Sequence, residues 1–153
     1  QPEKTGFINN SELINEYQGK KDIEDKYKLR DEVSKRKSDS LGQAYQIEVM
    51  GLQQKIAKMS EKQQQAAAQP FEQKWQLIEQ QMKSEQQKFQ KDFQTEIDSS
   101  IIEVADFVKG YAKKNGYTYI FGTSDISRSV MYGDETKDLT KDILEALNIS
   151  YKE

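Results

Sequence analysis

A long stretch of helical periodicity between Lys20 and Lys114 constrains this chain more than any other feature. In the second half of this stretch, apolar residues recur almost entirely at steps of three, four or seven, which places them on one side of a helix. These residues are Phe71, Trp75, Ile78, Met82, Phe89, Phe93, Ile97, Ile101, Val104 and Val108. A similar stripe in the first half consists of Tyr45, Val49, Leu52, Ile56 and Met59. Two narrow stripes of similar length predict an antiparallel pair of helices.

A polar break at Ala66-Ala67-Ala68-Gln69-Pro70 separates the two halves. Pro70 suits the first turn of a helix, because its missing N–H costs nothing there. We interpret the preceding run Gln63-Gln64-Gln65 as a frayed end. The pattern therefore predicts a helical hairpin, or coiled-coil tentacle, over residues 20–114 with its tip near residues 63–70. Each arm would extend about 65 Å, so much of it is expected to stand in water or to be covered by partners.

Shorter elements are predicted at both ends of the chain. Thr5–Asn9 predicts a strand, and a short helix is expected from Glu12 to about Tyr17 after a good capping residue. Asn115-Gly116 is a helix stop signal. Two further strands are expected at Tyr117–Phe121 and Ile126–Tyr132, paired as a hairpin with the N-terminal strand as a third member. A helix from Lys141 to about Leu147 would follow.

The predicted fold is therefore α+β. A small β-containing body is built from residues 1–19 plus 115–153, and the helical hairpin of residues 20–114 is inserted between its halves. A body of roughly 55 residues seldom buries enough apolar surface to be stable alone, and its strand edges invite pairing. We expect the body to oligomerise, and the candidate contact residues are Phe7, Ile8, Tyr117, Tyr119, Phe121, Val130 and Tyr132.

Composition excludes several classes of function. The net charge is -3, and no basic block interleaved with aromatic residues points to nucleic acid. No apolar run is long enough to span a membrane. The chain has no histidine and no cysteine, and no phosphate-binding loop, nucleophile elbow or metal-ligand spacing is present. Its carboxylate pairs lie in segments of alternating charge, which is typical of solvated helix faces. We predict no catalytic, cofactor-binding or metal-binding residues, and hence no enzyme.

The order of elements and several local motifs resemble the Skp/OmpH family of periplasmic chaperones. The motifs are Gly6-Phe7-Ile8-Asn9 with Ser11, Leu13 and Glu16-Tyr17, then Gly116-Tyr117-Thr118-Tyr119-Ile120-Phe121, Val130-Met131-Tyr132, and Asp138-Leu139-Thr140-Lys141-Asp142-Ile143-Leu144 with Leu147-Asn148. The resemblance covers nearly the whole chain. The Gln- and Lys-rich arms are similar to those of Bacteroidetes-type members.

This resemblance implies an ATP-independent holdase. Family members form a jellyfish-like homotrimer, in which three bodies join their strands and three helical tentacles enclose a cavity for unfolded outer-membrane proteins. It also implies a periplasmic location, although the first residues do not have the pattern of a signal peptide. Peripheral contact with membrane or lipopolysaccharide, expected of some members, fits poorly with the acidic net charge. Seven lysines against four glutamates between Gln53 and Lys91 nevertheless predict a basic tip.

Six apolar side chains of the second arm are candidates for contact with client chains: Phe71, Trp75, Ile78, Met82, Phe89 and Phe93. Methionine and aromatic residues suit promiscuous contact, although the same residues could simply form the seam between the arms. Two other functions remain open. The arms could bind a partner helix as an adaptor coiled coil, or the chain could be a prefoldin-like hairpin chaperone.

Overall fold

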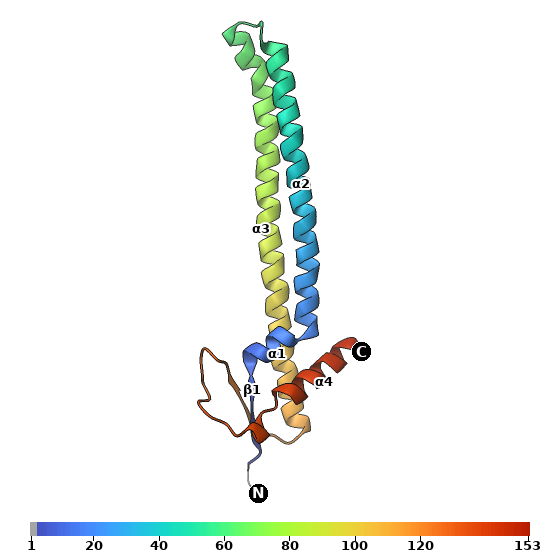
Figure 1. Ribbon diagram of the computed structural model, residues 1–153, viewed down its shortest axis with the longest axis vertical. Coiled ribbons are helices and arrows are strands. Elements are labelled where there is room, and N and C mark those ends of the chain that lie inside the picture. The colour runs from blue at the N-terminus through green and yellow to red at the C-terminus, as the bar shows by residue number, and fades with distance from the viewer. Residues whose placement is uncertain (1–2) are drawn as a thin grey trace. The chain divides into compact units, whose positions relative to one another are not determined.

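A computed structural model describes residues 3–153 as five helices and two strands, one of the helices a short 3₁₀ helix. In chain order they are β1 (Thr5–Asn9), α1 (Asn10–Glu16), α2 (Gln18–Ile56), α3 (Glu61–Lys114), β2 (Tyr119–Thr123), the 3₁₀ helix η1 (Glu135–Lys137) and α4 (Thr140–Lys152) (Figure 1). The predicted α+β fold with a long helical hairpin is confirmed. The first two residues of the predicted body lie outside the described part. Within that part, every helix lacks the long apolar stretch that crossing a bilayer requires.

The chain divides into two compact units. The first, here called the terminal unit, consists of residues 1–26 and 93–153. The second, here called the hairpin unit, consists of residues 27–92 and holds α2 from Tyr27 to its end, the turn, and α3 as far as Asp92. Figure 1 shows α2 and α3 lying side by side within the hairpin unit.

The sheet of the terminal unit has two parallel strands. β1 pairs with β2 in a register that runs from Thr5 opposite Tyr119 to Asn9 opposite Thr123. Parallel strands need a long connection, and here the two long helices provide it. The other edge of β1 receives the residues before α4, where the Leu139 N–H donates to the Phe7 carbonyl at 2.9 Å.

The predicted strand at Ile126–Tyr132, and with it the predicted β-hairpin, is wrong. This segment is a loop, in which the side chains of Ile126, Met131 and Tyr132 are 96%, 84% and 85% exposed. The Thr123 hydroxyl closes the loop by accepting the Val130 N–H at 3.2 Å. Strand propensity becomes stable structure only where side chains pack on neighbours. Within the described residues, the side chains of Ile126, Met131 and Tyr132 have no neighbouring layer to pack against.

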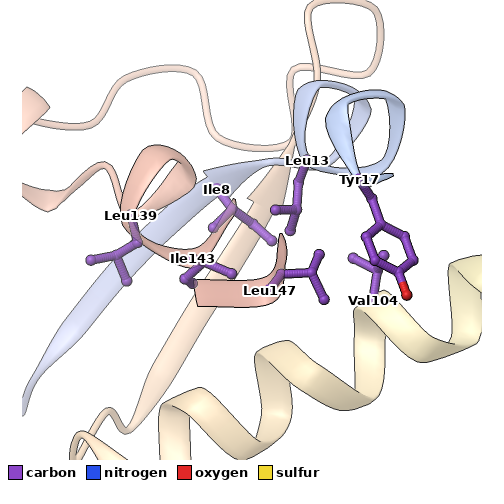
Figure 2. Close-up of a cluster of buried hydrophobic side chains, with 7 residues drawn as sticks. All are labelled: Ile8, Leu13, Tyr17, Val104, Leu139, Ile143 and Leu147. Carbon is purple, nitrogen blue, oxygen red and sulfur yellow. The ribbon is translucent and has the colours of Figure 1, made fainter. Parts of the chain in front are cut away.

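The core of the terminal unit gathers residues from both ends of the chain (Figure 2). Leu13 of α1 and Ile143 of α4 are fully buried. The whole cluster is Ile8, Leu13, Tyr17, Val104, Leu139, Ile143 and Leu147. At roughly 2 kcal/mol for each fully buried aliphatic side chain, this layer holds β1, α1, α3 and α4 together.

The Asp138-Leu139-Thr140 motif has a specific structural role. One Asp138 carboxylate oxygen accepts the Thr140 N–H at 3.0 Å and the Thr140 hydroxyl at 2.6 Å, which gives the first N–H group of α4 a partner. The same hydroxyl accepts the Asn9 N–H at 2.9 Å. Leu139 packs on Gly6, where an added Cβ would lie 2.5 Å from the leucine Cδ1. The motif therefore joins α4 to β1, and any side chain at position 6 would displace Leu139.

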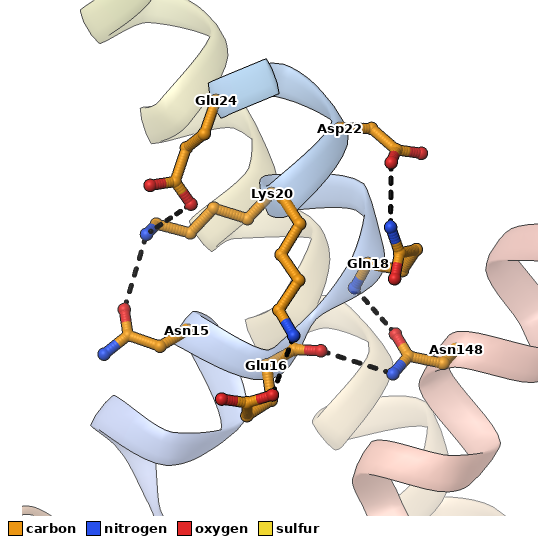
Figure 3. Close-up of polar contacts among 8 residues, drawn as sticks. Asn15, Glu16, Gln18, Lys20, Asp22, Glu24 and Asn148 are labelled. Carbon is orange, nitrogen blue, oxygen red and sulfur yellow. Dashed lines mark hydrogen bonds and ion pairs between the residues drawn. The ribbon is translucent and has the colours of Figure 1, made fainter. Parts of the chain in front are cut away.

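Asn148 stabilises the corner between α1 and α2 (Figure 3). Tyr17 has an extended backbone there, with φ of -64° and ψ of 121°, so the helical hydrogen bonds are interrupted. The Asn148 side-chain oxygen accepts the Gln18 N–H at 2.8 Å, and its amide donates to the Glu16 carbonyl at 3.3 Å. One side chain from α4 thus satisfies both backbone groups at the corner.

The turn of the hairpin lies at residues 57–60, and the break predicted at 66–70 is wrong. Ser60 and Gln63 form a capping box, in which the Ser60 hydroxyl accepts the Gln63 N–H at 3.3 Å and the Gln63 side-chain oxygen accepts the Ser60 N–H at 3.2 Å. Gln64 donates its amide to the Ile56 and Met59 carbonyls, at 3.0 and 3.2 Å. Pro70 lies inside α3.

Three ion pairs fix the register of the hairpin unit. They join Arg30 to Asp92 at 3.3 Å, Lys37 to Glu85 at 3.2 Å, and Glu48 to Lys74 at 2.7 Å. Both helices advance by seven residues between the first two pairs and by eleven between the last two. The antiparallel arms therefore keep one alignment along this length.

Candidate functional site

An aromatic cluster spans the two helices of the hairpin unit. The ring of Trp75 on α3 meets that of Tyr45 on α2 edge-on, with centroids 5.1 Å apart and an interplanar angle of 86°. Phe71, one helical turn before Trp75, lies 5.5 Å from Tyr45. Aromatic pairs at such distances are worth about 1 kcal/mol beyond their buried area. The cluster therefore helps to hold the arms together while its ring faces remain partly accessible.

Glu48 orients the tryptophan. Its carboxylate accepts the Trp75 indole N–H at 3.0 Å and pairs with the Lys74 ammonium at 2.7 Å. The hydrogen bond from Lys74, followed by that from Trp75, lowers the pKa of Glu48 below its ordinary value. The ammonium of Lys74 also lies 5.5 Å from the centre of the Trp75 ring. A carboxylate and an aromatic ring thus bind one cation together.

A groove of about 450 Å³ opens beside this cluster. Its size falls within the range of sites that take small ligands or a few side chains. Gly42 forms part of its wall, and a Cβ added there would meet nothing within 4 Å. The lining residues are Ser38, Leu41, Gly42, Tyr45, Phe71, Glu72, Trp75, Gln76, Ile78, Glu79 and Met82.

The structure brings four of the six predicted client-binding residues together. Phe71, Trp75, Ile78 and Met82 are half-buried and line the groove. They belong both to the seam between the helices and to an accessible surface.

The other two predicted residues lie elsewhere. Phe89 packs edge-on against Tyr27, with ring centroids 5.5 Å apart, and the Arg30 guanidinium lies 5.5 Å from both rings. Phe93 is half-buried and belongs to the terminal unit.

The contribution of α2 to the groove was the harder part to predict. Tyr45 belongs to the predicted stripe, and Leu41 extends that stripe by one turn. Gly42 leaves space in the groove because it has no side chain. The periodicity of apolar residues does not detect such a position. The one available signal was a glycine of poor helix propensity next to the stripe.

The predicted contact residues of the body divide into buried and exposed groups. Ile8 is only 5% exposed and belongs to the core, while Phe7, Tyr117 and Val130 are half-buried. Tyr119 and Phe121 on β2 are 54% and 48% exposed, and their rings stack 5.5 Å apart. Tyr132 is exposed on the loop.

Alternate residues of a strand share a face. Tyr119 and Phe121 therefore form an apolar surface on β2, which pairs only with β1 in the described residues.

Comparison with known proteins gives a consistent result. The family model of OmpH-like outer membrane proteins matches residues 4–147. A crystal structure from Caulobacter crescentus CB15, described as an OmpH-like outer membrane chaperone, is similar with a TM-score of 0.81. The match covers 98% of this chain and 86% of that one, at 11% sequence identity, so it shows a shared fold. No curated protein matches this chain.

Proposed function

The chain belongs to the OmpH-like family of outer membrane proteins, and from this premise we propose that it is an ATP-independent holdase for unfolded outer-membrane proteins. Family membership supports a chaperone role that depends on binding and involves no catalysis. The observation that carries the proposal is the groove of the hairpin unit, where Tyr45, Phe71 and Trp75 remain partly accessible. Partly accessible aromatic rings gathered in a groove can contact another chain.

The mechanism follows from weak contacts. An unfolded β-barrel chain exposes alternating apolar residues and aggregates through its strands. Aromatic rings and Met82 offer contact area without demanding one sequence. Several such contacts on more than one copy give useful total affinity through effective concentration. Each contact is weak, so the client leaves without nucleotide hydrolysis once it can gain more free energy by folding into a membrane.

We also propose how the chain is divided between its tasks. Residues 1–19 plus 115–153 form the body that assembles three copies, and residues 20–114 form the arm that binds clients. The exposed pair Tyr119 and Phe121 supports this assignment, because large apolar surfaces on an open strand favour association. The periplasm is the compartment in which such clients occur.

The test of the proposed function is suppression of aggregation. An unfolded porin is diluted from urea into buffer, and light scattering is followed with and without the purified chain. We expect suppression near one assembled particle per client, and weaker suppression by Phe71→Ala and Met82→Ala variants. Scattering that is unchanged at several-fold excess of the chain would rule the holdase out.

One observation favours a second function, that of an adaptor for a partner helix. Ile47, Met50 and Leu77 are 71%, 60% and 67% exposed on the hairpin unit and do not line the groove. Exposed apolar residues on helices can bind another helix. Binding to a folded helical partner, combined with no effect on the porin, would favour this function.

A further inference from the structure

Two carboxylates at the rim of the groove indicate which client segments bind there. Glu72 and Glu79 line the groove, whose wall contains no lysine or arginine. Both glutamates are exposed. Neither makes an ion pair within residues 3–153, whereas Glu48 on the same cluster is paired with Lys74. The groove therefore combines apolar walls with two carboxylates that form no ion pair with any residue of the described chain.

We propose that this groove binds extended polypeptide segments in which an aromatic or aliphatic residue lies next to lysine or arginine. The inference rests on the proposed function and assigns it a specificity. The apolar side chain enters the space beside Gly42 and packs against Tyr45 and Trp75. The neighbouring cation is then held by Glu72 or Glu79 at the rim.

A cation held by a carboxylate beside an aromatic ring already occurs within this chain. Lys74 is held by the Glu48 carboxylate at 2.7 Å, with its ammonium 5.5 Å from the Trp75 ring centre. A cation placed near a carboxylate and an aromatic face gains from both. The groove offers the same combination to a cation from another chain.

The basic tip predicted from the sequence does not oppose this preference. Long-range attraction depends on the summed charge, but salt screens it over about 8 Å at physiological ionic strength. Among the described residues that line the groove, only Glu72 and Glu79 are charged, and the nearby Lys74 is already paired with Glu48. The charges at the rim therefore determine which side chains bind. The summed charge of the arm affects only the rate of encounter.

The experiment uses Trp75, the single tryptophan of the chain, as the fluorescent probe. The full chain is titrated with a short tryptophan-free peptide of alternating Phe, Lys and Ser, and with a matched peptide in which Glu replaces Lys. We expect the Lys peptide to bind about tenfold more tightly at low salt, and the difference to shrink as salt rises. Equal affinities, or no binding of either peptide, would overturn the proposal.

Charge variants separate the rim from the net charge of the chain. The affinities of the Glu72→Gln/Glu79→Gln variant for the two peptides should differ by no more than about twofold. The control Glu32→Gln/Asp39→Asn removes the same charge from exposed sites on α2 outside the groove. It should keep most of the tenfold preference. If both double variants lose the preference equally, the rim is not the site.

A filled-groove variant tests the location. Gly42→Leu places a side chain in the groove, and replacing glycine also favours the helix, so the variant should fold. We expect it to bind neither peptide. Gly51→Leu is the matched control, since its Cβ would also meet nothing within 4 Å and it does not line the groove. Peptide binding that survives Gly42→Leu overturns the proposal.

The proposal and the proposed function fail in different ways. Suppression of porin aggregation without preference for the Lys peptide keeps the holdase and removes the groove specificity. Self-association of the hairpin in the groove would appear as a concentration-dependent mass abolished by Gly42→Leu, and would also remove the specificity. Loss of aggregation suppression itself removes the function on which the proposal rests.

Discussion

At the scale of single residues, Asn148 satisfies two backbone groups at a corner where helical hydrogen bonding stops. It accepts from the Gln18 N–H and donates to the Glu16 carbonyl. We expect Asn148→Ala to lower the free energy of unfolding by about 1–2 kcal/mol, since both groups lose their partner. Urea denaturation followed by circular dichroism measures this loss.

A neighbouring asparagine serves as the control. Among residues 3–153, the Asn15 side chain hydrogen-bonds only to the flexible Lys20 side chain, at 3.3 Å. Asn15→Ala should therefore change stability by less than about 0.5 kcal/mol. Equal effects of the two substitutions would show that Asn148 does not stabilise the corner.

Tyr17 gives a prediction about alkaline pH. Its ring is 4% exposed, and its hydroxyl donates to Glu103 at 2.9 Å. Burial, followed by the hydrogen bond to Glu103, raises the pKa of Tyr17 from 10 to about 12. Because the folded-state pKa is the higher one, the stabilisation is complete below pH 10. It is lost as the pH rises toward about 12.

The measurement is the difference between two pH profiles. The free energy of unfolding of the wild type should fall more steeply above pH 10 than that of Tyr17→Phe, which has no hydroxyl to ionise. Lysines and the tyrosines that do not contact Tyr17 contribute to both profiles and cancel in the comparison. Parallel profiles would contradict the assignment.

At the scale of elements, the turn depends on a glutamine run that looks featureless in the sequence. Gln64 donates to the carbonyls of Ile56, the last residue of α2, and of Met59 in the turn, whereas Gln65 is exposed. We expect Gln64→Ala to lower the free energy of unfolding by about 1 kcal/mol. Gln65→Ala should leave it unchanged within about 0.5 kcal/mol. Urea denaturation of the two variants tests this, and indistinguishable midpoints would refute it.

Some of these elements could be predicted from the sequence and others could not, for physical reasons. The arms and the first strand follow from local periodicity, and Asn9 caps α1 as its residue type suggests. The turn lies before the predicted break because the capping pair Ser60 and Gln63 starts α3 there, and the helix continues through Pro70.

The absent strand has a different cause. Ile126–Tyr132 has the residues of a strand, but strand formation depends on a partner that local sequence does not reveal. The same limit applies to the groove. Its stripe on α3 was predicted, whereas the space beside Gly42 depends on how two helices are aligned.

At the scale of the whole molecule, the exposed face of β2 leads to a prediction about assembly. Replacing Tyr119 and Phe121 by threonine keeps strand propensity and removes the stacked rings. If three copies assemble through this face, Tyr119→Thr/Phe121→Thr should lower the solution mass to that of one chain. Sedimentation equilibrium measures this mass.

A residue of equal exposure on α4 provides the control. Ile149 is 54% exposed, as is Tyr119, and Ile149→Thr should leave the mass unchanged. A wild-type chain that sediments as a single copy at all concentrations would exclude the trimer.

The register of the hairpin also bears on how its length can change. Arg30 and Glu48 are eighteen residues apart, as are Lys74 and Asp92. Eighteen residues make about five complete helical turns, so a block of this size returns each arm to the same orientation. Deleting or duplicating matched blocks in both arms should preserve every remaining ion pair between them, which makes the length of the arms adjustable independently of the terminal unit. A change in one arm alone would misalign all of them.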